Sequence, residues 1–306
     1  MKRFIYIIFF FLFAIVSTSQ TLGIADGAMT TDGEAVKRSG MTFSKEILAQ
    51  TADTIVMGLD TLEKYNQRLV RIKIDDNMPL SELDTLVSLL NKRQFTVIMA
   101  LQDTIDALVQ LKQFADRVNG LSGVDYKDAG CVAMWQIPLK APSAAETVNQ
   151  VKHFRNEPLV ALVVDVKGME KLEWEVMKIN PDAVVLDIDP LKEGWITFEN
   201  ERKALPSVFL KLTAMIDNAS RVAADNGIPV LINIEGFPRD NGFRKPDSDY
   251  NSRLGLWNYI KSKLDEVPQL WGVTIGQWMG KGNFTEATTS NAIYASDCSL
   301  LEQMAQ

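Results

Sequence analysis

From Lys37 onward, short apolar runs typical of buried strands alternate with stretches whose apolar residues recur at helical spacing. The predicted strands are Lys37–Phe43, Arg68–Ile74, Phe95–Gln102, Cys131–Pro138, Leu159–Asp165, Ala183–Asp189, Pro229–Glu235 and Leu270–Gly276. The predicted helices between them are Lys45–Tyr65, Ser81–Lys92, Thr104–Val118, Ala144–Arg155, Met169–Ile179, Leu205–Asn226 and Arg253–Glu266. Alternation at roughly 30-residue spacing predicts a single closed (β/α)8 barrel, the TIM-barrel architecture.

An open, doubly wound sheet is the alternative fold for the same alternation. That fold would carry a glycine-rich phosphate-binding turn after an early strand, and this sequence has none. No linker, low-complexity tract or break in composition divides the chain. We therefore expect residues 20–306 to form one barrel domain.

Residues 1–19 have the features of a signal peptide. Lys2 and Arg3 precede the apolar run Phe4–Val16, and small residues in Ser17–Ser19 suit a cleavage site. The apolar run is too short to span a bilayer comfortably. We expect a secreted or periplasmic protein with no membrane insertion once this leader is removed.

Composition narrows the classes of function. The net charge is -7 and no basic cluster stands out, which argues against nucleic acid as a partner. The single histidine, His153, lies in a polar helical run and leaves little basis for a zinc site or a Ser-His-Asp triad. We expect no metal and no cofactor.

Polar residues gather where the predicted strands end. They are Arg71, Lys73, Asp75, Gln102, Gln136, Lys140, Asp165, Asp187, Asp189, Asn233 and Glu235, with Gln277 and Trp278 after the eighth strand. Barrel enzymes place their catalytic groups at these carboxyl ends of the strands, and residues two apart share one strand face. Carboxylates mixed with cations are costly to desolvate, so they favour a functional mouth over the alternative, a purely structural polar layer.

Two carboxylates that face one cleft suit glycoside hydrolysis, in which one protonates the leaving oxygen and the other attacks or activates water. Tryptophans at a barrel mouth could add flat surfaces for sugar rings. The candidates are Trp135, Trp195, Trp271 and Trp278. Cation binding by Asp187 and Asp189 is a weaker alternative, because it would require a hard metal ion and no known motif is present.

Several segments resemble clan A glycoside hydrolases, especially family 5 β-mannanases and cellulases. DGAMTTDGEAVKRSGMTF (Asp26–Phe43) is similar to their opening, and LEKYNQRLVRIKI (Leu62–Ile74) to their second strand, with Arg71 at the position of its arginine. INIEGFPRDNG (Ile232–Gly242) is similar to the segment that carries the nucleophile. This resemblance implies that Glu235 is the nucleophile.

The same resemblance extends to WGVTIGQWMGKG, residues 271–282, which is similar to the eighth strand of those enzymes. It implies a substrate-stacking role for Trp278. The fourth strand departs from the family pattern, because MWQIPLKAP has Lys140 where the acid/base glutamate is expected. Gln102 likewise stands where the family has histidine. A surviving hydrolase would need Asp189 or Asp165 as its acid.

We therefore expect a secreted glycoside hydrolase-like protein that acts on or binds β-linked polysaccharide or oligosaccharide of the mannan or glucan type. If active, the resemblance implies a retaining O-glycosyl hydrolase with Glu235, Asp189 and Asp165 as catalytic candidates. The predicted substrate-binding residues are Arg71, Gln102, Trp135, Lys140, Asp187, Asn233 and Trp278. The alternatives are a non-catalytic barrel that binds a glycan or a partner protein, and an enzyme that uses Lys140 as a Schiff-base amine.

Overall fold

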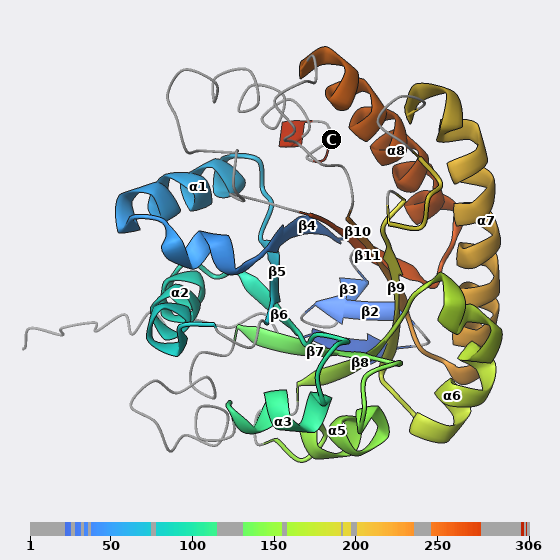
Figure 1. The fold of residues 1–306 in the computed structure, drawn as a ribbon, viewed down its shortest axis with the longest axis horizontal. Helices are drawn as coiled ribbons and strands as arrows, with labels where there is room; N and C mark the ends of the chain where they lie inside the picture. Colours follow the sequence, from blue (N-terminus) through green and yellow to red (C-terminus); the bar gives the residue numbers. More distant parts are fainter. Residues whose placement is uncertain are drawn as a thin grey trace, which may run out of the picture.

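The computed structural model describes residues 22–25, 28–31, 34–35, 38–74, 78–114, 131–154, 158–190, 192–196, 201–235, 246–276, 301–302 and 304. Within these residues, eight parallel strands close into a barrel in the order β10-β11-β4-β5-β6-β7-β8-β9 (Figure 1). The predicted (β/α)8 barrel is confirmed.

Each predicted strand is present within one or two residues of its expected bounds. The barrel strands are β4 (Arg38–Phe43), β5 (Leu69–Lys73), β6 (Thr96–Ala100), β7 (Val132–Pro138), β8 (Leu159–Val164), β9 (Ala183–Ile188), β10 (Val230–Ile234) and β11 (Leu270–Ile275). The helices are α1 (Ala52–Lys64), α2 (Leu80–Lys92), α3 (Ala107–Lys112), α5 (Ala144–Val151), α6 (Leu172–Ile179), α7 (Glu201–Asn226) and α8 (Pro246–Glu266). Short 3-10 helices η1 (Lys45–Ala49) and η2 (Val166–Lys171) precede α1 and α6.

Two of the predicted helices are each divided into a short 3-10 helix and an α-helix. The Thr51 hydroxyl accepts a hydrogen bond from the Thr54 N–H at 3.3 Å, so α1 starts anew after η1. Asp165 caps the start of η2 by accepting from the Gly168 N–H at 2.9 Å, and α6 follows η2 without a side-chain cap at Lys171. None of the described helices is long and apolar enough to cross a membrane.

A small antiparallel sheet precedes the barrel. It consists of β1 (Leu22–Ala25), β2 (Ala28–Thr31) and β3 (Glu34–Ala35), and β2 contacts β11. Since β3 ends only two residues before β4 begins, this sheet lies at the amino end of the barrel strands. The carboxyl end, where the candidate residues lie, is left to the loops that follow each strand.

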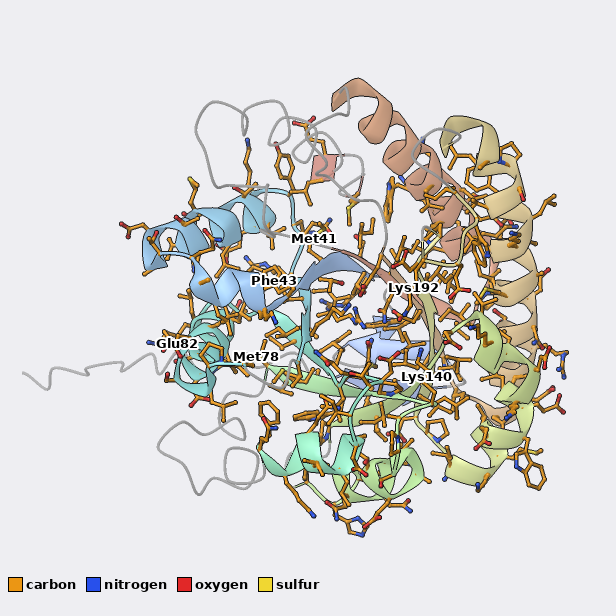
Figure 2. All side chains as sticks on the ribbon, in the orientation of Figure 1. Met41, Phe43, Met78, Glu82, Lys140 and Lys192 are labelled. Carbon is orange, nitrogen blue, oxygen red and sulfur yellow. The ribbon has the colours of Figure 1, made fainter. Side chains whose placement is uncertain are left out.

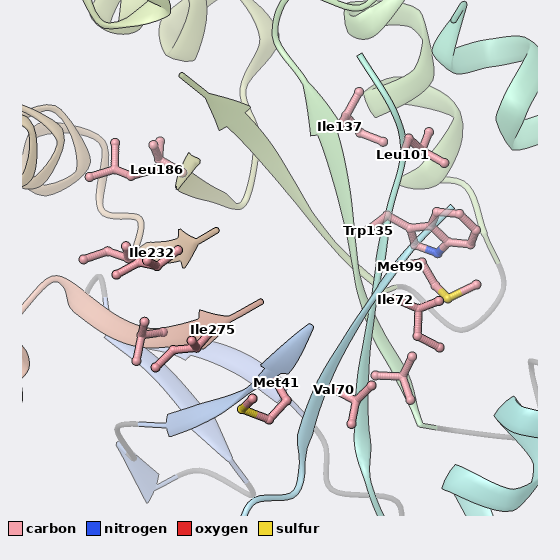
Figure 3. Close-up of a cluster of buried hydrophobic side chains, with 14 of the residues drawn as sticks. Met41, Val70, Ile72, Met99, Leu101, Trp135, Ile137, Leu186, Ile232 and Ile275 are labelled. Atoms are coloured by element: carbon pink, nitrogen blue, oxygen red, sulfur yellow. The ribbon is translucent and has the colours of Figure 1, made fainter. Parts of the chain in front are cut away.

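Side chains alternate between two apolar layers along each strand. Met41, Ile72 and Trp135 are among those that point outward to pack under the helices (Figure 3). A second cluster, which includes Leu69 and Leu231, fills the inside of the barrel. The next inward positions along these two strands are Arg71 and Asn233, because a strand returns to the same face every two residues. The barrel interior thus changes from apolar to charged toward the carboxyl ends.

The prediction that Trp135 binds substrate is wrong, because its side chain does not reach the cavity. The ring is fully buried on the outer face of β7 and packs edge-on against Phe114 at 5.6 Å and Phe154 at 6.0 Å between ring centroids. Trp271 is also buried, in the apolar cluster inside the barrel. Both tryptophans are core residues.

Candidate active site

A cavity of about 980 Å³ opens at the carboxyl ends of the barrel strands. Among the predicted site residues, those that line it are Arg71, Gln102, Lys140, Asp165, Asp187, Asp189 and Glu235. Lys140 and Lys192, which both line it, are labelled in Figure 2. The barrel therefore gathers side chains from six strand ends into one site.

Glu235 follows β10 and is held by two cations from β5. Its Oε1 lies 2.6 Å from Arg71 Nη1 and its Oε2 lies 2.6 Å from Lys73 Nζ. Burial alone would raise the pKa of Glu235, but the charges of Arg71 and Lys73 lower it to about 2. Glu235 is therefore ionised at neutral pH, with both oxygens engaged.

The backbone at Gly276 passes close to the Glu235 side chain, and the absence of a side chain at Gly276 gives Glu235 room for this orientation. A Cβ atom added to Gly276 would lie 3.3 Å from Glu235 Cγ, closer than most side chains pack. Glycine at position 276 leaves the space beside Glu235 open.

Asp187 is the second carboxylate beside the same guanidinium. Its Oδ1 lies 3.8 Å from Arg71 Nη2 and accepts a hydrogen bond from Asn233 Nδ2 at 3.5 Å. The pKa of Asp187 is raised, chiefly by burial and further by the charge of Glu235, against the opposing effect of Arg71. We call Arg71, Lys73, Asp187 and Glu235 the floor cluster. Its two carboxylates have pKa values displaced in opposite directions.

Buried amides hold the floor cluster in place from below. Arg71 Nε donates to Gln136 Oε1 at 2.8 Å, and Asn233 Nδ2 donates to the same oxygen at 3.0 Å. Thr274 Oγ1 in turn donates to Asn233 Oδ1 at 2.8 Å. Asn233 thus lies beneath the cavity. It contacts Asp187 directly and Arg71 through their shared partner Gln136, so we describe it as a positioning residue.

A separate group of charges surrounds Lys140, which follows β7. Its Nζ lies 2.5 Å from Asp103 Oδ2 and 3.1 Å from Asp165 Oδ2. Burial alone would lower the pKa of Lys140, but the two carboxylates raise it, while the pKa of Asp165 is lowered despite its burial by the Gly168 N–H and Lys140. We call Lys140, Asp103 and Asp165 the rim cluster.

The rim cluster contradicts one earlier hypothesis. A Schiff-base lysine must lose its proton, which requires a lowered pKa, whereas that of Lys140 is raised and its side chain is 48% exposed. Asp165 is held in its ionised form, so it is poorly suited to donate a proton.

The remaining predicted residues have simpler surroundings. Asp189 accepts a hydrogen bond from the Lys192 N–H at 2.9 Å, and the backbone N–H of Gln102 donates to Gln110 Oε1 at 2.9 Å. Trp195 lies under Lys211, whose Nζ is 5.1 Å from the ring centroid, and does not line the cavity. Trp278 lies outside the described residues.

Sequence reasoning placed Lys73 among the polar residues at the strand ends but gave it no role, and it left Asp103 out. Both roles were detectable, because Lys73 shares a strand face with Arg71 and Asp103 directly follows Gln102 at a strand end. Within the described residues, no aromatic side chain lines the cavity and no group of three His, Cys, Asp or Glu side chains could hold a metal ion.

No protein-family model and no curated protein matches this chain. Among solved structures, a β-glucuronidase from an uncultured Clostridium sp. is similar, with a TM-score of 0.61 and 14% identity over 93% of this chain and 53% of that one. An endo-1,4-β-mannanase from Rhizomucor miehei has a TM-score of 0.59 and 11% identity over 93% of this chain and 99% of that one. For a Ruminococcus gnavus β-glucuronidase the TM-score is 0.57 and the identity 10%, over 91% and 52% of the two chains.

At these levels of identity, the similarities establish the fold of the chain. The chain is a TIM barrel with distant structural similarity to glycoside hydrolases. It spans about half the length of the β-glucuronidases that it matches and nearly all of the mannanase.

Proposed function

We propose that this chain is a secreted glycoside hydrolase-like protein that binds β-linked oligosaccharide or polysaccharide in the cavity at the barrel mouth without cleaving it. The observation that carries the proposal is the ion pairing of Lys140 with Asp103 and Asp165. An ammonium group occupies the position after β7 where the family resemblance expects a carboxylic acid. Asp165 is held ionised and the raised pKa of Lys140 makes its ammonium group a weak acid, so neither side chain is suited to protonate the leaving oxygen.

Carbohydrate suits the cavity because its polar groups are fixed before a ligand arrives. Arg71 is almost fully buried and is held by Gln136 and Glu235, so its direction is set by the fold. Preorganised donors and acceptors reduce the entropy cost of binding a hydroxyl-rich ligand. The β-linkage and the mannan or glucan type follow from the family resemblance, and the mannanase among the structural neighbours supports them.

Hydrolysis is the second candidate, and the floor cluster favours it. Glu235 is ionised and Asp187 has a raised pKa, which is the division of roles that a nucleophile or base and an acid require. Both carboxylates contact one guanidinium, so their separation falls below the upper limit of roughly 9.5 Å for a catalytic pair. In this reading Asp187 replaces Asp189 and Asp165 as the acid.

One pair of measurements separates the two candidates. Isothermal titration with manno- and gluco-oligosaccharides measures binding, and reducing-sugar release from mannan, glucan and xylan measures cleavage. We expect binding without release, and we expect Glu235→Gln to weaken binding while Glu173→Gln, an exposed residue of α6 outside the cavity, leaves it unchanged. Release that Glu235→Gln and Asp187→Asn each abolish would establish the second candidate, and absence of binding and release would refute both.

Export is part of the same proposal. The predicted leader, residues 1–19, lies outside the described residues, and its sequence pattern is the support. Mass spectrometry of the exported protein is expected to find Gln20 as its first residue. Recovery of the protein only inside the cell, with Met1–Ser19 intact, would contradict export.

A further inference from the structure

The cavity continues beyond the barrel mouth. Besides the strand ends, its lining includes Ala144–Glu146 at the start of α5 and Gly168, Lys171, Glu175 and Lys178 on η2 and α6. We call this part of the cavity, between α5 and η2–α6, the lateral arm. None of these residues belongs to the floor cluster or the rim cluster, so the lateral arm is a separate surface of the same cavity.

Regular secondary structure forms the wall of the lateral arm. Lys171, Glu175 and Lys178 are spaced four and three residues apart, so they lie along one helical face. Leu172 and Val176, on an adjacent face of α6, are buried in the core. The three polar side chains are therefore presented to the cavity by a helix whose adjacent face is anchored.

The rim cluster fixes this wall against the barrel. Asp165 pairs with Lys140 and also caps η2, so one side chain joins the mouth to the start of the wall. Gly168 makes the approach possible, since a Cβ atom there would lie only 2.8 Å from Val164 Cγ1. These contacts fix the position of the lateral arm relative to the barrel mouth.

The charges of the lateral arm differ from those of the floor cluster. Among the described residues, neither Lys171 nor Lys178 forms an ion pair, whereas Arg71 and Lys73 are both paired. Ammonium groups donate hydrogen bonds and the Glu175 carboxylate accepts them. Donors and an acceptor on one helix face suit neighbouring hydroxyls, which need both.

We infer that the lateral arm binds the distal units of an uncharged oligosaccharide whose other units lie at the barrel mouth. This inference rests on the proposed carbohydrate-binding function and adds to it the place where the further sugar units of the chain bind. The cavity volume of about 980 Å³ supports it, because pockets of roughly 300–1,000 Å³ accommodate whole drug-sized ligands. The mixed charge of the lining favours no net charge on the chain.

A chain-length series tests the inference. We would titrate the full protein with β-1,4-linked manno- and gluco-oligosaccharides, from the monosaccharide to the hexasaccharide. Affinity is expected to rise with length, by about 5-fold for each further unit that gains hydrogen bonds in the lateral arm. Binding should change little with salt concentration, because the ligand carries no charge.

Matched variants locate the effect. Lys171→Ala combined with Lys178→Ala is expected to weaken hexasaccharide binding by roughly 10-fold through lost hydrogen bonds and to leave disaccharide binding unchanged. Lys92→Ala combined with Lys112→Ala removes two exposed lysines outside the cavity and is expected to change neither. All four positions are exposed, so both double variants should fold.

Three outcomes would overturn the inference. The monosaccharide could bind as tightly as the hexasaccharide, the two double variants could behave alike, or acidic oligouronides could bind in preference with a steep salt dependence. Each of these would leave binding at the barrel mouth intact. Failure of the native protein to bind any member of either series would contradict the proposed function itself.

Discussion

The floor cluster and the rim cluster contain the same kinds of side chain, cations between carboxylates, but they differ in their surroundings. Arg71 in the floor cluster is 4% exposed and rests on buried amides, whereas the Lys140 side chain in the rim cluster is 48% exposed and joins residues that follow strands. Removing one partner of a buried ion pair is strongly destabilising, because it leaves the other charge buried and unpaired. Exposed ion pairs contribute little to stability, because solvent screens them. The same interaction should therefore have very different consequences at the two places.

Arg71→Met is expected to give the largest effect. It leaves the largely buried Glu235 paired with Lys73 alone and the partly exposed Asp187 without its cation. We expect a loss of about 3–5 kcal/mol in the free energy of unfolding, measured by urea titration. Arg221→Met, which removes an exposed arginine on α7, should cost less than about 1 kcal/mol. Equal costs for the two would contradict the contrast between buried and exposed pairs.

The pH dependence of stability is expected to show the next effect. The folded pKa of Glu235 is about 2, against an ordinary value of 4.5. A lowered folded pKa contributes stability above pH 4.5 that is lost as the pH falls toward 2, here about 3 kcal/mol. Unfolding titrations between pH 2 and 7 should give a shallower slope for Glu235→Gln than for the native chain. Lys73→Met, which leaves Arg71 in place, should give an intermediate slope, and three equal slopes would refute the assignment.

Asp187 should respond in the opposite sense. Its raised pKa means that the folded state holds the proton more tightly than the unfolded chain, so the carboxyl disfavours folding increasingly as the pH rises. Asp187→Asn removes that cost and can still accept from Asn233. We expect its unfolding free energy at pH 7 to stay within about 1 kcal/mol of native, well above that of Glu235→Gln. A loss as large as that of Glu235→Gln would show that both carboxylates are needed ionised.

The barrel was predictable because each of its strands is a buried apolar run with a clear two-residue or continuous pattern. The small sheet β1–β3 was missed because strands of four and two residues have no such pattern. Trp135 was misassigned although the pattern contained the answer. Gln136 faces the barrel interior, so its neighbour Trp135 must face outward.

The pairing within the site could not be predicted from sequence in the same way. Lys73 and Glu235 are 162 residues apart, and only closure of the barrel brings their charged atoms to 2.6 Å. The protonation preferences of Asp187 and Glu235 depend on which carboxylate receives two cations. Sequence position placed both at the mouth, but three-dimensional contacts decide their roles.

Lys140→Met is expected to give the smallest change in stability, below about 1 kcal/mol, because the pairs it breaks are half-exposed. Thermal unfolding of this variant beside Arg71→Met would measure the difference between the two clusters directly. The variant should also lose the effect that lowers the pKa of Asp165, so that carboxyl should titrate closer to its ordinary value in an NMR pH titration. If Lys140→Met instead destabilised the chain as much as Arg71→Met, the rim cluster would be a structural support of the barrel, and its ion pairs would no longer distinguish a binding site from a catalytic one.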